Sequence, residues 1–178
     1  MNKHLEELIE LSKIDKAIDA FEPRVEAAHA RLAVVEEQES DIEREILQLE
    51  EDIKDAELKK AKNDLHIQEL TDKLEANKKK GAEAKTEKEI KALQLEEEIA
   101  REQLDFANEE IERLENLIET RKAEVETKKA ELEAIKEKSA LLKEEIEKEL
   151  VEIEKEKQEL FAKKQELVSK MSQKILAF

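Results

Sequence analysis

The sequence predicts an all-α protein whose chain forms a long, kinked, antiparallel coiled-coil helical hairpin. Charged residues make up 46% of the 178 residues and aromatic residues only 2%, with a single Gly and a single Pro. The chain therefore lacks the turns and the aromatic core of an ordinary globular domain. Apolar residues nevertheless reach 39% and recur at a fixed period, which a disordered chain would not show. The phase of that period breaks once, near the middle of the chain.

The first twenty-two residues are predicted to form an N-terminal amphipathic helix. Its apolar face is wider than a two-stranded seam uses. The residues of this face are Leu5, Leu8, Ile9, Leu11, Ile14, Ile18 and Phe21. Pro23 follows directly, and a proline in a helix interior removes a hydrogen bond and clashes with the preceding turn. We therefore expect the helix to kink or to restart at Pro23.

Two apolar seams follow this helix. Alternating steps of three and four residues from Val25 to Asn77 give sixteen positions, of which twelve are apolar. The same steps from Ile90 to Ile146 give seventeen positions, of which thirteen are apolar. Seams of this period are typical of a coiled coil. Each seam is therefore expected to form one arm of the hairpin.

The tip of the hairpin is predicted where the phase breaks. Gly81 follows three lysines, and a helix ends readily where a Gly adopts the left-handed conformation behind cationic side chains. Thr86 can cap the next helix, with Glu89 reaching back to the Thr86 amide in a capping box. The predicted segments are an N-terminal helix at 1–22, a first arm at 23–80, a tip loop at 81–86 and a second arm at 87–178.

The similar lengths of the two arms set an expected register. If Asn77 faces Ile90 across the tip, then Glu39 faces Lys128, and two charged interruptions of the seams form a pair. A paired interruption costs less than a lone buried charge and can specify the register. The polar interruptions left without an evident partner are Lys60, Asn63 and Arg121.

The chemistry of the sequence does not indicate an enzyme or a cofactor. The chain has no Cys, and His4, His29 and His66 are too far apart to place two metal ligands on one helical face. Its many carboxylates are expected on exposed surfaces, without a cleft that would shift a pKa into a catalytic range. No apolar run approaches the ~20 residues of a membrane span, and the N-terminus is not a signal peptide. We expect a cytoplasmic protein with no membrane contact.

Two ends of the hairpin are candidate binding surfaces. The mouth, where both chain ends are expected to meet, is richer in apolar residues than a two-helix seam requires. Its candidate partner-binding residues are Leu5, Leu8, Ile9, Phe161, Met171 and Phe178. These surfaces either pack on each other or form a docking face for a protein partner.

The tip carries the second candidate surface, a cluster of positive charge. Its residues are Lys78, Lys79, Lys80, Lys85 and Lys88. The cluster is either a solvated cap of the helix end or a binding site for anions or nucleic acid. The formal net charge of -16 opposes nucleic-acid binding by the chain as a whole, because such binding normally depends on a basic patch.

Three segments resemble the coiled-coil part of one bacterial family, namely HLEELIELSKIDKAIDAFEP, KTEKEIKALQLEEEIA and KKQELVSKMSQKILAF. This family joins a long helical hairpin to a C-terminal four-cysteine zinc ribbon, and the likeness is to its epsilonproteobacterial members involved in flagellum biogenesis. The resemblance covers essentially the whole chain. It implies binding and stabilisation of sigma-54 and binding of a flagellin mRNA. The ribbon would follow Phe178, so the resemblance implies no zinc within this chain.

Three functions stay open at this point. The first is a coiled-coil interaction module, a protein-binding and chaperone-like factor that acts in flagellum biogenesis through sigma-54. The second is a nucleic-acid adaptor whose basic tip contacts RNA or DNA, with mRNA implied by the resemblance, with help from the absent ribbon domain. The third is a structural spacer or oligomerisation stalk, and whether two hairpins associate as a homo-oligomer is also left open.

Overall fold

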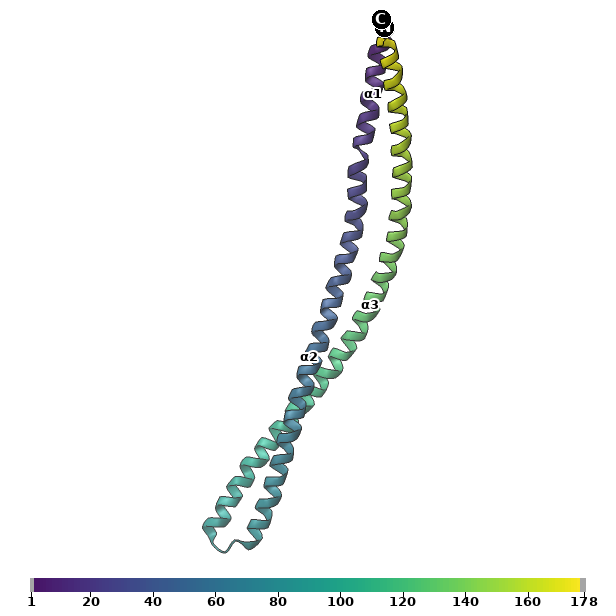
Figure 1. Ribbon diagram of the computed structural model, residues 1–178. Coiled ribbons are helices and arrows are strands. Elements are labelled where there is room, and N and C mark those ends of the chain that lie inside the picture. The colour runs from purple at the N-terminus through teal and green to yellow at the C-terminus, as the bar shows by residue number, and fades with distance from the viewer. Residues whose placement is uncertain (1, 177–178) are drawn as a thin grey trace. The chain divides into compact units, whose positions relative to one another are not determined.

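Three helices make up most of the computed structural model, which describes residues 2–176. Helix α1 spans Lys3–Asp19, α2 spans Phe21–Glu83 and α3 spans Glu87–Leu176. Helices α2 and α3 run antiparallel and are joined by a short loop (Figure 1). No strand occurs among residues 2–176. The predicted all-α antiparallel hairpin is therefore confirmed.

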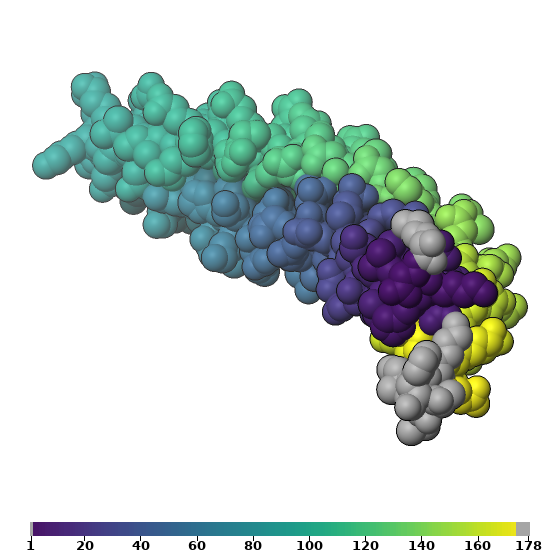
Figure 2. Space-filling model, turned by 90° about the horizontal axis from the view of Figure 1, so that it is seen from above, coloured from purple at the N-terminus to yellow at the C-terminus, as the bar shows by residue number. Residues whose placement is uncertain are grey.

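The chain divides into two units. The tip unit is Ile42–Glu131 and contains the second part of α2, the loop and the first part of α3. The terminal unit contains the residues up to Asp41 and those from Leu132 onward, and so includes α1. Within the terminal unit, the beginning of the chain lies against the end of α3, purple against yellow in Figure 2.

The core of the tip unit is the apolar seam between α2 and α3. Leu114 is 1% exposed and is the largest side chain to be fully buried among the described residues. Three alanines are also buried in this unit, and small side chains of this kind let two helix backbones approach closely. The buried apolar residues of the tip unit are Ile42, Ile46, Ala56, Leu70, Ala100, Ala107, Leu114 and Val125.

The core of the terminal unit continues the same pattern. Its buried residues are Ile14, Phe21, Ala28, Val35, Ser139, Ile146 and Ile153. Of all the seam positions expected from Val25 to Asn77 and from Ile90 to Ile146, only Ile90 and Glu97 are exposed. The sequence period therefore predicts the buried face of both arms well, since burial of a helical face follows the 3.6-residue repeat.

The register of the tip unit differs from the predicted one. The Asn77 side-chain amide donates to Glu96 over 3.2 Å, six residues beyond the expected partner Ile90. Lys128 pairs with Glu45 over 2.8 Å, again six residues beyond the expected Glu39. The predicted pairing of Glu39 with Lys128 is therefore wrong, because Lys128 pairs with Glu45 and α2 and α3 are displaced along each other relative to the expected alignment. Ile90 is exposed for the same reason, since it lies level with the last turn of α2.

The tip explains part of this displacement. Gly81 does not end a helix, because α2 continues through it to Glu83 and no glycine has a positive φ. The loop comprises residues 84–86, half the predicted length. Thr86 does cap α3, since its hydroxyl accepts from the Glu89 amide over 3.2 Å. The Glu89 carboxylate accepts from the Lys85 amide over 3.3 Å, one residue before the position that a capping box requires.

The restart near Pro23 is confirmed. Helix α1 ends at Asp19, Ala20 lies between the helices, and α2 begins at Phe21. Pro23 therefore occupies the first turn of α2. Backbone N–H groups in the first turn have no acceptor within the helix, so the missing N–H of proline costs no hydrogen bond there. The Ala20 amide donates to the Lys16 carbonyl over 3.1 Å, so the end of α1 is itself capped.

Of the three polar interruptions without an evident partner, only Lys60 finds a partner on the other helix. Lys60 pairs with Glu115 over 3.2 Å, the Asn63 amide donates to the Lys59 carbonyl over 3.0 Å, and Arg121 pairs with Glu124 over 3.0 Å. The expected absence of a partner across the seam is therefore wrong for Lys60, whereas Asn63 and Arg121 bond only within their own helices, and the buried Arg121 Nε atom has no hydrogen bond. The long basic side chains reach the edges of the seam, where the exposed carboxylates lie.

Candidate functional site

The α1 part of the predicted mouth is an exposed apolar patch. Leu5, Leu8 and Ile9 are 47%, 42% and 47% exposed. Their spacing of three and four residues places them on one face of α1. The patch therefore offers three large aliphatic side chains that the hairpin does not cover.

The α3 part of the mouth contains one exposed aromatic side chain. Phe161 is 46% exposed, Val168 is 44% exposed one heptad later, and Met171 is half-buried. Phe178, which the sequence assigns to the same surface, lies outside the described residues. Lys164 of α3 pairs with Asp15 of α1 over 2.6 Å, so the two helices of the mouth are also joined by charge.

A groove of about 580 Å³ opens in the terminal unit where α1 gives way to α2. We call it the junction groove. Its apolar lining consists of Ile18, Phe21, Val25, Leu150, Ile153 and Phe161. Phe21 and Ile153 are buried at 5% and 2% exposure and form the floor, whereas the partly exposed Phe161 stands at the rim. The sequence analysis identified the apolar residues Ile18 and Phe21 but did not predict that they face a groove.

The rim of the junction groove is mainly acidic. Asp19, Glu22 and Glu154 line it, together with His29 and Lys157. The Lys157 ammonium lies 6.0 Å from the centre of the Phe161 ring, a cation–π distance. Three carboxylates therefore surround an apolar floor beside one ammonium group. An apolar floor with a few polar groups at the rim is typical of a ligand-binding groove.

In the terminal unit, the edge of the α2–α3 seam that lies opposite the junction groove is closed by ion pairs. Arg24 pairs with Glu156 over 3.0 Å and Arg31 with Glu149 over 2.6 Å. At 100° per residue, Arg31 lies on one side of the buried Ala28 and His29 lies on the other. His29 lines the junction groove, so Arg31 belongs to the opposite edge. The two edges of the seam in the terminal unit are therefore chemically different, one bridged by arginines and the other open.

The tip lysines are exposed but do not form a pocket. Lys78, Lys79, Lys80, Lys85 and Lys88 are all exposed, and none of their ammonium groups has an ion pair among residues 2–176. They lie on the last two turns of α2, in the loop and on the first turn of α3. The cluster is therefore a diffuse positive surface at the end of the tip unit.

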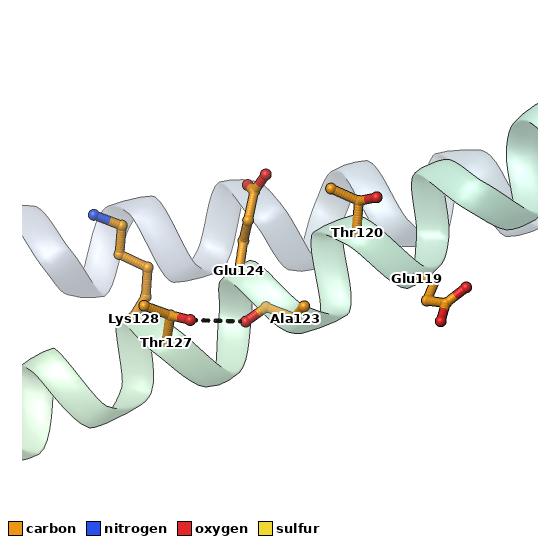
Figure 3. Close-up of a pocket in the computed structure, with 6 residues that line it drawn as sticks. All are labelled: Glu119, Thr120, Ala123, Glu124, Thr127 and Lys128. Atoms are coloured by element: carbon orange, nitrogen blue, oxygen red, sulfur yellow. Dashed lines mark hydrogen bonds between the residues drawn. The ribbon is translucent and has the colours of Figure 1, made fainter.

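A surface hollow of about 570 Å³ lies along α3 in the tip unit. Figure 3 shows the six residues that line it. The Thr127 hydroxyl donates to the Ala123 carbonyl over 3.1 Å, and Glu119 points away from Glu124. Hydrogen bonding to Glu45 raises the pKa of the Lys128 ammonium, so this lysine stays protonated. The side chains that line the hollow do not converge on one point (Figure 3).

Other charged pairs of the surface are structural. The hydrogen bond from Arg113 lowers the pKa of Glu110, and the same bond raises the pKa of Arg113. No group of three or more potential ligands suited to a metal ion occurs within residues 2–176. Over the same range, no helix combines the length and the hydropathy of a membrane span.

Comparison with known proteins identifies two similar structures. The HP0958 protein of Helicobacter pylori is 34% identical, with a TM-score of 0.75 over 95% of this chain and 71% of that one. CT398 of Chlamydia trachomatis is 18% identical, with a TM-score of 0.83 over 93% of this chain and 70% of that one, and this likeness concerns the fold alone. No family model and no curated protein matches the chain.

Proposed function

The chain belongs to the family of the Helicobacter pylori HP0958 protein, and from this premise we propose that it is a non-enzymatic, protein-binding coiled-coil module in flagellum biogenesis. We propose sigma-54 as its partner and a chaperone-like effect on that partner. The likeness of its opening, tip and closing segments to sigma-54-associated coiled-coil proteins supports this choice of partner. The proposal implies a cytoplasmic protein, since a sigma factor works there.

The observation that carries the proposal is the exposed apolar surface of the mouth. Leu5, Leu8 and Ile9 form a continuous patch on α1, and Phe161 adds an aromatic side chain on α3. By contrast, the exposed Leu58 and Leu65 on α2 are single residues among charged neighbours, which is normal for a protein surface. Contiguous apolar area such as that of Leu5, Leu8 and Ile9 is what a protein interface needs at its centre.

A pair of substitutions at the mouth tests this function. Leu5→Glu combined with Leu8→Glu is expected to weaken binding to purified sigma-54 by roughly tenfold or more, because it places two charges where apolar surface would be buried. Binding is measured by fluorescence anisotropy, after circular dichroism has shown that helicity is retained.

Two matched variants make this test specific. Leu58→Glu combined with Leu65→Glu introduces the same charges on exposed leucines of the tip unit, and binding should stay within about twofold. Lys79→Glu combined with Lys80→Glu removes positive charge from the tip and is also expected to leave binding intact. If only this tip pair abolishes binding, the assignment to the mouth is wrong.

A second candidate function is RNA binding at the tip, which the free ammonium groups of the five tip lysines favour. It predicts salt-dependent retardation of a flagellin mRNA, lost on Lys79→Glu with Lys80→Glu. The control, Lys54→Glu with Lys62→Glu, changes exposed lysines on α2 by the same charge. Absence of any retardation at low salt would rule this function out for the chain.

A further inference from the structure

The junction groove has a shape and a charge that the proposed function does not use. Its volume of about 580 Å³ lies within the ~300–1,000 Å³ typical of binding sites in proteins. Ile18 and Phe21 lie on either side of the break at Ala20, so the groove is formed where the chain changes from α1 to α2. Its floor is apolar and its opening is wide enough for large side chains of a partner.

The charge of the rim selects the partner. Within the described chain, Asp19 and Glu22 have no hydrogen bond or ion pair from their carboxylates, and Glu154 accepts only a 3.4 Å hydrogen bond from Gln158. Lys157 is the only lysine or arginine among the residues that line the groove, and it lies beside the Phe161 ring, whereas Arg24, 5.6 Å from the centre of the Phe21 ring, is paired with Glu156. The rim therefore has carboxylates without a basic partner. A ligand with basic side chains would provide one.

The opposite edge shows that this arrangement is particular to the groove. There, Arg24 and Arg31 of α2 already neutralise Glu156 and Glu149 of α3. On that edge, the carboxylates that could pair with a cationic ligand are already paired with arginines. On the groove edge, the carboxylates of Asp19, Glu22 and Glu154 have no basic partner. A second copy of this chain, with a net charge of -16, would be repelled.

The backbone around the groove decides the form of the ligand. Both walls are α-helices, whose backbone groups are bonded within the helix, so no sheet edge is available for an added strand. An apolar groove between helices is the usual receptor of an amphipathic helix, which inserts side chains spaced by three and four residues. The exposed aromatic Phe161 at the rim is the kind of residue that anchors such contacts.

We propose that the junction groove binds a basic amphipathic helix of the partner protein. A large apolar side chain of that helix inserts between Phe21 and Phe161, and its lysine or arginine side chains pair with Asp19, Glu22 and Glu154. The inference rests on the proposed function, since it specifies which part of a protein partner this chain binds and where.

The probe for this proposal is an 18-residue helical peptide with leucines along one face and lysines on both flanks. Its binding is measured by fluorescence anisotropy, alongside a peptide in which glutamates replace the lysines. Only the lysine peptide is expected to bind, and Phe161→Ala should weaken it by roughly tenfold. Glu22→Lys combined with Glu154→Lys should weaken it by at least as much, because the rim becomes positive.

Matched variants separate the groove from general acidity. Phe106→Ala removes a 71% exposed aromatic side chain of the tip unit, and Glu98→Lys combined with Glu102→Lys makes the same change in net charge there. Both are expected to leave peptide binding within about twofold. Equal losses in groove and control variants, or full binding by the groove variants, would overturn the proposal. So would a dimer in light scattering that Phe161→Ala converts to a monomer, since a second copy would then occupy the groove.

The same variants distinguish this inference from the proposed function. If sigma-54 binding survives the groove variants but is lost with Leu5→Glu combined with Leu8→Glu, the mouth binds the partner and the groove inference fails. If sigma-54 does not bind at all while the lysine peptide binds at the groove, the partner is wrong and the groove inference holds. If the groove variants lose both sigma-54 binding and peptide binding, the result supports sigma-54 as the partner and the groove as a site that binds it.

Discussion

At the scale of single residues, burial in the seam separates positions that look alike in sequence. Leu114 is 1% exposed in the tip unit, and Leu58 of the same unit is 63% exposed. Leu114→Ala is expected to lower the free energy of unfolding by about 2 kcal/mol or more, because it removes buried apolar atoms and leaves a cavity. Denaturant unfolding followed by circular dichroism measures this. Leu58→Ala is the control and should change stability by no more than about 0.5 kcal/mol.

Gly81 gives a second test at this scale, because its conformation differs from the predicted one. Gly81 is helical, and a Cβ atom added there would meet no atom within 4 Å. Gly81→Ala is therefore expected to raise the free energy of unfolding by roughly 0.5–1 kcal/mol, through lower backbone entropy of the unfolded chain.

The control for Gly81 lies in the same turn. Ala82→Gly is expected to lower stability by a similar amount, since it introduces the entropy that Gly81→Ala removes. Thermal unfolding followed by circular dichroism compares the two. A loss of stability in Gly81→Ala would mean that this glycine adopts the left-handed conformation expected from the sequence.

At the scale of the helices, the register of α2 and α3 is fixed by contacts between residues distant in sequence. A carbodiimide joins a carboxylate and an amine only when they are in contact. We expect it to link Lys128 to Glu45 and Lys60 to Glu115, whose charged atoms lie 2.8 and 3.2 Å apart. Mass spectrometry of the digested protein identifies the links.

Isotope labelling shows whether these links lie within one chain. In a mixture of labelled and unlabelled protein, links within a hairpin contain only one isotope, whereas links between chains mix the two. A Lys128–Glu39 link in place of Lys128–Glu45 would restore the register predicted from the sequence. Mixed-isotope links alone would contradict the hairpin and favour a dimer of straight helices.

At the scale of the whole molecule, the two units differ in how the chain forms them. The tip unit is one continuous segment, Ile42–Glu131, closed by a loop of residues 84–86. The terminal unit brings together both ends of the chain. Local contacts and short loops lower the entropic cost of folding, so the tip unit depends less on the rest of the chain.

We therefore expect a fragment of residues 42–131 to fold alone. It should be largely helical by circular dichroism and unfold in a cooperative thermal transition. A fragment of residues 2–41 is the control and should be mostly unfolded, because a helix without its packing partner is marginal in water. A disordered 42–131 fragment would show that the tip unit requires the terminal unit.

The candidate sites were only partly predictable from the sequence. The exposure of Leu5, Leu8, Ile9 and Phe161 agrees with the excess of apolar residues noted at the mouth. The junction groove was not predicted, because it requires α3 residues such as Ile153 to lie beside Phe21 of α2. No local pattern in the sequence identifies which residues of two distant helices share a groove.

The sequence by itself determined the helices, the buried face of each arm and the cap at Thr86. These features depend on residues within one or two turns of one another, so a period of 3.6 residues and a capping residue suffice to predict them. The tertiary structure alone decided the register, the helical state of Gly81 and the open, acidic edge of the junction groove. Several alignments of two heptad seams bury similar apolar area, so the choice between them depends on contacts across the hairpin, such as Asn77 with Glu96 and Lys128 with Glu45.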